Sequence, residues 1–409
     1  MDVPQVSKIT LITYLDLKSV NSGPAHSVMV VARRLFEEGR LRCVICRGYH
    51  RCNDLPEQLF RTPPNRIFHK LSNRIISLLC RRLRLNQRLI SERLFDYCVS
   101  HSACLKETDI ALFFKPGFYR STRMLNKMGK TGIAWASILH PEFNLQQFKK
   151  TVATFNMDAD GPYSDKKRVE YISNFYEAVN YIIVESNLAR DSFIKLGFSK
   201  RRIYRLNGGF SIDCQKFKPV KTNLQKKKFS ALHISHMSAI KGIGYLLDAW
   251  QKLGLPQSEL ALVGDCDLEI RRLIDRYQLQ SLIMPGHVTD TLSWYQWADV
   301  FVSPSVADNR PNTILESMAT GVPVIASNMC GLSEVISNGV DGFVYQFDSI
   351  DELKECITWC HRNPHKLKEM GKAAREKAER FQREDFAHNI ISAVSELTEP
   401  SFVEKGKLP

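Results

Sequence analysis

Two carboxylates and a lysine in the second half of this 409-residue chain could bind a phosphorylated sugar. Asp308 stands in a polar segment, Glu316 lies eight residues further on, and Lys241 stands at an earlier loop–helix junction. A lysine gives a phosphate a point charge, and the free N–H groups and dipole of a helix N-terminus add to it. Carboxylates beside such a site are suited to accept hydrogen bonds from sugar or ribose hydroxyls.

The elements that must position these residues form a predicted β-α-β unit. The apolar run 299–302 predicts a buried strand, and Asp308 and Asn309 are candidate caps of a helix that would end at Gly321. A second strand would follow at 322–327. Ligands bind at the carboxyl ends of strands in such sheets, which favours a site here. The alternative is an ordinary capped helix whose acidic residues are solvated.

The spacing acid-x7-Glu, followed by Ser-Met-Ala-x-Gly-Val-Pro-Val-Ile-Ala, fills residues 308–326. It resembles the donor-site signature of the retaining GT-B-fold glycosyltransferases of family 4 (glycosyl transferases group 1), and the resemblance extends over most of the chain. It implies an α/β fold in which two Rossmann-like domains with parallel sheets face each other across a cleft. It also implies transfer of a hexosyl group from a nucleotide sugar to an acceptor hydroxyl, with retention of configuration.

The resemblance assigns roles to individual residues. Lys241 and the amides near Asn312 and Thr313 would stabilise the leaving diphosphate without a metal. Glu316 would hold the ribose hydroxyls, and Asp308, where the family usually has Glu, would hold the donor sugar. Backbone groups near His287 and Val288 would hold the base.

His140 follows the predicted strand 132–139 and matches a family histidine that contacts the transferred sugar. We therefore expect it to project into the cleft as a catalytic residue; the alternative is a strand-end surface histidine. His236 stands where the family has arginine, which removes one fixed positive charge from the donor site. Gly23-Pro24 replaces two family glycines in the first β–α loop, which either touches the ligand or is an ordinary connection.

Strand and helix patterns alternate along the chain and predict two domains of ordinary size. We place the acceptor-binding domain at 1–217 and the nucleotide-sugar-binding domain at 218–382, joined by a lysine-rich linker. In the family, a terminal helix such as 383–409 crosses back onto the first domain.

The positive charge is concentrated in the first half. Residues 1–221 hold 37 Lys and Arg against 19 Asp and Glu, whereas the remainder holds 20 against 24. Within this half, residues 66–95 show apolar positions at helical spacing among many arginines. Such a basic amphipathic helix either lies on an anionic membrane surface or packs on the core with a solvated basic face. A lipid-linked or oligosaccharide acceptor would match the membrane interpretation.

The remaining features limit cofactors and location. The Asp158–Asp160 pair has the spacing of a metal-binding Asp-x-Asp but lies in a poorly patterned segment, so we expect no essential divalent ion and no other cofactor. Eleven scattered cysteines indicate reduced thiols, and the N-terminus lacks a signal-peptide layout. No apolar run reaches the 18 or so residues of a membrane span. We expect a cytoplasmic protein that can also bind peripherally to the cytoplasmic face of the inner membrane.

Surface polysaccharide biosynthesis, either lipopolysaccharide or exopolysaccharide, is the role that the resemblance favours. The Asp308 and His236 departures leave open a non-catalytic relative that binds sugars or nucleotides. A sequence pI near 9.2 is also consistent with a third hypothesis, a protein that binds nucleic acid. We find neither a recognisable module nor basic residues interleaved with exposed aromatics, so we expect no nucleic-acid partner.

Overall fold

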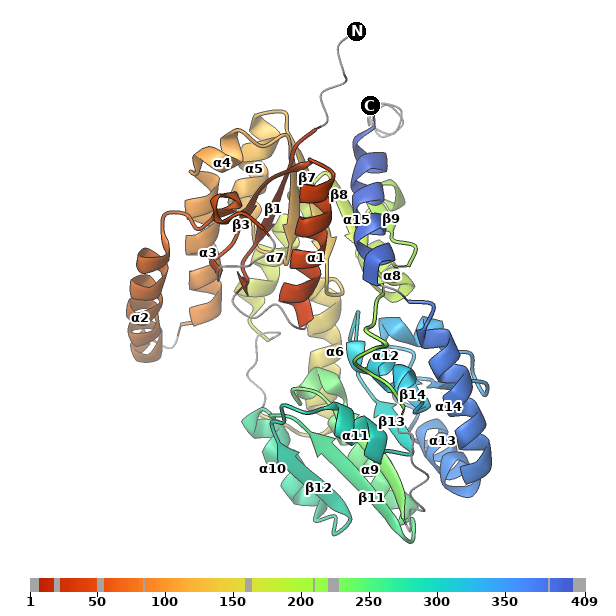
Figure 1. Ribbon diagram of the computed structural model, residues 1–409. Coiled ribbons are helices and arrows are strands. Elements are labelled where there is room, and N and C mark those ends of the chain that lie inside the picture. The colour runs from red at the N-terminus through yellow and green to blue at the C-terminus, as the bar shows by residue number, and fades with distance from the viewer. Residues whose placement is uncertain are drawn as a thin grey trace.

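The computed structural model describes residues 7–17, 23–49, 55–83, 85–158, 164–208, 210–219, 228–381 and 383–399. Two α/β domains lie one above the other, and the long helix α6 reaches from the first toward the second (Figure 1). Each domain is built on a parallel sheet, so both sheets place the carboxyl ends of their strands at one edge.

The first domain holds a seven-stranded sheet in the order β5-β3-β1-β6-β7-β8-β9. Most of its strand residues are buried, as expected for a sheet covered on both faces. Its strands are β1 Ile9–Thr13, β3 Leu41–Ile45, β5 Phe60–Arg61, β6 Ile110–Phe114, β7 Thr131–Ala136, β8 Tyr181–Val184 and β9 Ile203–Arg205. A separate small pair joins β2 Asp16–Leu17 and β4 Gly48–Tyr49.

The second domain holds a six-stranded sheet in the order β12-β11-β10-β13-β14-β15. Its order reverses between β10 and β13, which places a topological switch point at the ends of these two strands. Its strands are β10 Phe229–Ile234, β11 Ser258–Val263, β12 Leu282–Gly286, β13 Val300–Ser303, β14 Val324–Ser327 and β15 Gly342–Tyr345.

Helices cover the two sheets. Those of the first domain are α1 Gly23–Glu37, α2 Arg66–Leu83, α3 Gln87–Ser100, α4 Ala103–Lys106, α5 Tyr119–Lys127, α6 Pro141–Thr154, α7 Lys166–Ala178 and α8 Asn187–Ile194. Those that follow are α9 Ile243–Leu253, α10 Leu268–Tyr277, α11 Leu292–Trp297, α12 Asn312–Ala319, α13 Ile350–Arg362, α14 Pro364–Ala378 and α15 Arg383–Thr398. No helix in these described ranges is both long and apolar enough to cross a membrane.

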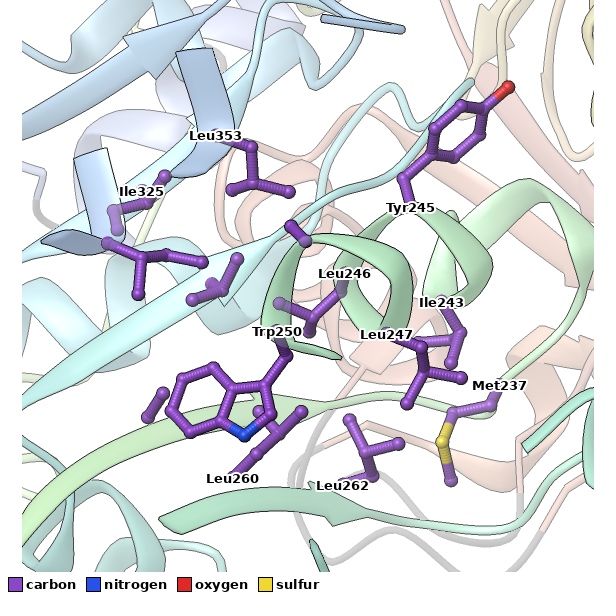
Figure 2. Packing of buried hydrophobic residues seen from close by; sticks show 14 of the residues in the cluster. Met237, Ile243, Tyr245, Leu246, Leu247, Trp250, Leu260, Leu262, Ile325 and Leu353 are labelled. Carbon is purple, nitrogen blue, oxygen red and sulfur yellow. The ribbon is translucent and has the colours of Figure 1, made fainter. Parts of the chain in front are cut away.

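The core of the second domain forms around α9. Leu246, Leu247 and Trp250 recur at helical spacing and pack against Leu260 and Leu262 of β11 (Figure 2). Figure 2 also shows Tyr245 pointing away from this group. The Tyr245 ring instead meets Phe155, just beyond the end of α6, with ring centroids 4.8 Å apart. The first domain therefore contributes side chains to the core of the second.

The last helix returns to the first domain. Phe386, Ile390 and Val394 of α15 are buried in the same cluster as the apolar face of α1. Figure 1 shows α15 beside α1 and β9, far in sequence but adjacent in space. The polar face of α15 adds hydrogen bonds, such as Arg40 Nη1 to Ser395 Oγ at 2.8 Å. These contacts join the two ends of the chain.

The segment 66–95 differs from the predicted single helix. It forms α2 and then α3, and the break lies at Asn86, whose side-chain oxygen accepts a hydrogen bond from Leu89 N at 2.9 Å. An N-cap of this kind satisfies a donor that a new helix would otherwise leave unpaired. The α3 half packs on the domain, whereas α2 leaves much of its apolar side exposed.

Candidate functional site

A cavity of about 360 Å³ lies where the two domains meet. The first domain lines it from the loop after β7, from α3 and from α6, and the second domain lines it from the loops after β10, β11 and β13. The polar residues around it are Arg88, Ser137, Asn144, His236, Ser238, Lys241, Asp267, Glu269, Asp308 and Asn309. The loops after β10 and β13 belong to the switch point, where such sheets bind ligands.

Lys241 and Asp308 meet at this cavity and form an ion pair through Nζ and Oδ2. Both side chains are largely buried, so the pair is shielded from solvent more than a surface pair. The sequence placed both residues at a donor site, and the structure brings them together across 67 residues of chain.

The loop that carries Lys241 is locked against the loop that carries Asp308. Val306 N donates to Ile240 O at 2.8 Å. Gly242 has φ +70°, and a Cβ there would lie 1.9 Å from Pro304 O. Only glycine fits a positive φ with this close backbone approach. Gly242 therefore fixes where Lys241 stands.

The other side of Asp308 is held as tightly. Asp308 N donates to Met329 O at 3.1 Å, and Gly331 N donates to Asp308 O at 2.7 Å. A Cβ at Gly331 would lie 2.1 Å from Asn309 O. The Asp308 carboxylate also accepts a hydrogen bond from Arg310 N at 3.3 Å. The backbone thus positions this carboxylate without help from a ligand.

The start of α12 differs from the prediction. Asp308 and Asn309 do not cap the helix, which begins at Asn312 after Pro311. The reason is that both side chains have other partners: Asp308 pairs with Lys241, and Asn309 Oδ1 accepts from Ser186 Oγ at 2.6 Å. The first-turn N–H groups of Asn312 and Thr313 have no acceptor within the helix, as in any α-helix. Neither residue lines the cavity.

Glu316 lies one turn further along α12, half-buried, and accepts a hydrogen bond from Tyr295 Oη at 2.8 Å. Burial raises the pKa of the Glu316 carboxyl, and the hydrogen bond from Tyr295 opposes this shift. Glu316 does not line the cavity described above, so any role with a ribose would require a ligand that extends beyond that cavity along the second domain.

His140 is not where the sequence placed it. Its ring is buried among Tyr176, Phe193 and Phe198, with centroids 6.3, 5.1 and 5.2 Å away. Nδ1 accepts a hydrogen bond from Glu142 N at 3.2 Å and so caps α6. Burial lowers the pKa of His140 to about 4. The prediction of a cleft-facing histidine is wrong for this structure, because the turn after β7 directs the ring into the aromatic core.

The other predicted residues are distributed differently. His236 lines the cavity, and its Nε2 lies 3.0 Å from Asp267 Oδ1. His287 is exposed, with Nδ1 3.7 Å from Asp265 Oδ2, and Val288 packs on the core near α12. Gly23 begins α1 at the carboxyl edge of the first sheet and does not line the cavity.

The first domain contributes cavity residues that the sequence did not indicate. Ser137 and Asn144 line the cavity, and no described residue is hydrogen-bonded to Ser137 Oγ or Asn144 Oδ1. Arg88 lies on the same wall and donates to Glu92 Oε1 at 3.0 Å. Ser137 lay near the carboxyl end of the predicted strand 132–139, which was a usable signal. Asn144 lies inside a helix whose buried face the sequence could not assign to a cavity.

The Asp308 loop is also bound to the first domain. Arg310 Nη1 donates to Glu185 Oε1 at 3.0 Å; Glu185 is buried, and the Arg310 side chain is only 12% exposed. The Arg310 guanidinium lies 4.7 Å from the centroid of Phe386 in α15. Asn309 Nδ2 donates to Ala136 O at 3.3 Å. Polar contacts made by the Asp308 loop therefore hold the two domains together.

A buried charge cluster supports the first-domain wall. Glu92 accepts from Arg168 through both carboxylate oxygens, at 2.9 and 2.8 Å. Lys115, directly after β6 with φ 74°, lies close enough for the charges of Arg88, Arg168 and Glu185 to act on it. Burial, together with the charges of Arg88 and Arg168, lowers the pKa of Lys115 to about 8, and the nearby Glu92 and Glu185 oppose this shift. Cations outnumber carboxylates in this cluster, which favours an anionic group nearby.

Comparison with known proteins agrees with this geometry. Residues 215–377 match the model of glycosyl transferases group 1. A capsular polysaccharide biosynthesis glycosyltransferase, CapM of Staphylococcus aureus, is 26% identical over 188 residues, 44% of this chain and 49% of the relative. An uncharacterized 41.2 kDa protein in the cps region of Klebsiella pneumoniae is 25% identical over 218 residues, 51% of this chain and 60% of the relative. The chain thus spans about half the length of the curated relatives it matches.

Similarity over the whole chain comes from solved structures. Anabaena HepE in complex with UDP-glucose superposes with a TM-score of 0.64 at 18% sequence identity, covering 95% of this chain and 100% of HepE. The architecture is GT-B, with two Rossmann-like domains, which confirms the predicted fold class. Together, the match of the second domain and the shared fold support a GT-B glycosyltransferase as the class of protein.

Proposed function

We propose that the protein is a retaining glycosyltransferase that moves a hexosyl group from a nucleotide sugar to an acceptor hydroxyl. The bond from the sugar to the diphosphate breaks, its electron pair leaves with the nucleoside diphosphate, and the acceptor oxygen bonds to the same face of the sugar. The hydroxyl proton leaves with the diphosphate. The observation that carries this proposal is the Lys241–Asp308 pair, fixed by backbone contacts at a cavity between two Rossmann-like domains.

Each group then has a role. Lys241 and the first N–H groups of α12, at Asn312 and Thr313, stabilise charge on the leaving diphosphate, and this charge makes a divalent ion unnecessary. Asp308 exchanges part of its contact with Lys241 for hydroxyls of the donor sugar. Glu316, further along the same helix, accepts from the ribose hydroxyls. A uridine donor is supported by HepE, whose structure was solved with UDP-glucose.

We further propose that the acceptor is lipid-linked and serves surface polysaccharide biosynthesis. The capsular context of the two relatives supports the pathway. The membrane contact is supported by α2, which contains no Asp or Glu and exposes Ile67, Leu71, Ile75, Leu78 and Leu83. The first four of these side chains recur at three- and four-residue spacing and share one face of the helix. Figure 1 shows α2 at the outer edge of the first domain, beside α3.

The composition of α2 matches an anionic membrane surface. Eight of the twelve large hydrophobic side chains that are exposed in the described ranges lie between residues 67 and 85. Exposed Lys70, Arg74 and Arg82 accompany them. Apolar side chains that enter the headgroup region, beside cations that meet anionic lipids, are the features of a helix that lies in a membrane interface. The core-packing alternative does not account for this exposure.

Turnover of nucleotide sugars tests the catalytic proposal. We expect the wild type to release nucleoside diphosphate from at least one donor, and Lys241→Met to reduce the rate by roughly a hundredfold or more. Lys252→Met is the matched control, because Lys252 forms an exposed pair with Asp248. Equal rates for the two variants would refute the role of Lys241. NMR analysis of the anomeric product tests retention.

Vesicle sedimentation tests the membrane proposal. We expect binding to phosphatidylglycerol-containing vesicles but not to phosphatidylcholine vesicles, and loss of binding when Leu71 and Leu78 are both replaced by Glu. Val340→Glu is the control, since Val340 is equally exposed in the second domain. Binding that survives the double substitution would exclude α2, and a dimer that this substitution dissociates would indicate a second copy as the occupant.

A further inference from the structure

The first-domain wall of the cavity carries an unusual combination of groups. Asn144 is only 3% exposed, yet its Oδ1 has no hydrogen-bond donor among the described residues. Its amide orientation is determined, because Nδ2 donates to Leu139 O at 3.2 Å and a flipped amide would face that carbonyl with its own oxygen. A buried acceptor without a partner costs about 1–3 kcal/mol. Asn144 Oδ1 therefore needs a donor from outside the described chain, which a ligand in the cavity can supply.

Ser137 supplies a complementary group. Its Oγ is buried at the same cavity and likewise has no partner among the described residues. A hydroxyl can donate as well as accept. Two residues of this wall thus each hold a buried oxygen without a partner, one carbonyl oxygen that must accept and one hydroxyl that can donate.

The surface next to these groups is apolar. Phe148 lies four residues after Asn144 on α6, so the two side chains are neighbours on one face of the helix. Leu139, Phe148 and Met157 line the cavity from the first domain, and Ile240 and Ile270 line it from the second. A bare hydroxyl pressed against this patch would lose its hydrogen bonds to water, which is costly.

We propose that this cavity selects a nucleotide sugar with an N-acetylamino group. The acetamido N–H donates to Asn144 Oδ1, the acetyl carbonyl accepts from Ser137 Oγ, and the methyl group packs on the patch around Phe148. A plain hexose has hydroxyl donors but no methyl group. A 6-deoxy sugar has a methyl group beside its 4-hydroxyl but no carbonyl acceptor next to it. Of these three, the acetamido group carries the donor, the acceptor and the methyl group on one substituent. This inference rests on the proposed function and names its donor class.

The test compares matched donor pairs. The rate of nucleoside diphosphate release is measured for UDP-N-acetylglucosamine against UDP-glucose, and for UDP-N-acetylgalactosamine against UDP-galactose, with the same pairs linked to dTDP. We expect the acetamido member of at least one pair to have a kcat/KM higher by about tenfold or more. Equal values, or a preference for the plain hexose, would overturn the inference while leaving the transferase proposal intact. No turnover of any donor would overturn both.

Variants of cavity residues test which side chains determine the preference for the acetamido donor. Ser137→Ala should lower the ratio of kcat/KM for the acetamido donor to kcat/KM for the plain hexose by about five- to tenfold. Ser173→Ala is the matched control, because Ser173 Oγ is also buried without a partner among the described residues but lies outside the cavity. A Ser137→Ala variant that lowers both values equally would show a structural role and refute the proposed hydrogen bond.

Discussion

Replacing Arg310 by Met should destabilise the protein by about 3 kcal/mol, because it leaves the Glu185 carboxylate buried without its cation. The side chains of Arg310 and Glu185 are 12% and 1% exposed, and Nη1 lies 3.0 Å from Oε1. Removal of one partner from such a pair costs roughly 3–5 kcal/mol. We take the lower end because Trp135 Nε1 still donates to the same oxygen at 2.9 Å, and the charge of Lys115 acts on the same region.

The double-mutant cycle separates this charge effect from lost packing. In the Glu185→Gln background, Arg310→Met should cost less than about 1 kcal/mol, since no buried charge is then left unpaired. Urea unfolding followed by circular dichroism measures both values, and the single variant should also melt roughly 3–4 °C below wild type. Arg34→Met is the control, because Arg34 pairs with Glu38 at the surface, where such pairs contribute little. A cost near zero for Arg310→Met, or equal costs in both backgrounds, would refute this reasoning.

Three further substitutions have defined outcomes. Burial raises the pKa of Glu316 in the folded chain, so the wild type should lose stability as the pH rises through that pKa. The Glu316→Gln variant should not show this loss. Parallel curves of melting temperature against pH for the two proteins would contradict this prediction. Gly242→Ala should lower the free energy of unfolding by more than about 3 kcal/mol, because φ is +70° and the new Cβ meets Pro304 O. Gly254→Ala, where φ is +51° and no atom lies within 4 Å, should lower it by about 1 kcal/mol. Equal free energies of unfolding for the two variants would contradict this prediction. His140→Asn keeps a capping side chain and should change turnover less than about threefold; a hundredfold loss would restore His140 as a catalytic residue.

Local patterns were sufficient for much of the fold. The alternation of short apolar runs with amphipathic segments gave the parallel strands, because a strand buried on both faces must be apolar throughout. Lys241 and Asp308 were recognised from their places at loop–helix junctions, and both line one cavity. The predicted start of α12 was less accurate, because the two expected caps, Asp308 and Asn309, bond to other side chains.

The direction in which a side chain points could not be predicted from local sequence patterns. His140 and Ser137 both follow β7. The position of His140 after the predicted strand, and its match to a family histidine, favoured the histidine as the cavity residue. The turn between them reverses that assignment, so that the histidine joins the aromatic core and the serine faces the cavity. Asn144 could not be distinguished from a surface residue, because its burial depends on tertiary packing around α6.

The sequence by itself determined the two parallel α/β units, the concentration of positive charge in the first, and the residue types at the donor loops, since apolar periodicity and helix-end chemistry act over a few neighbouring residues. Only the tertiary structure decided which of those residues share a site. Lys241 and Asp308 meet, Asn144 and Ser137 are left without partners, and α2 keeps its leucines exposed because of how distant segments pack. Such contacts depend on the register and packing of elements far apart in the chain, which no local pattern encodes.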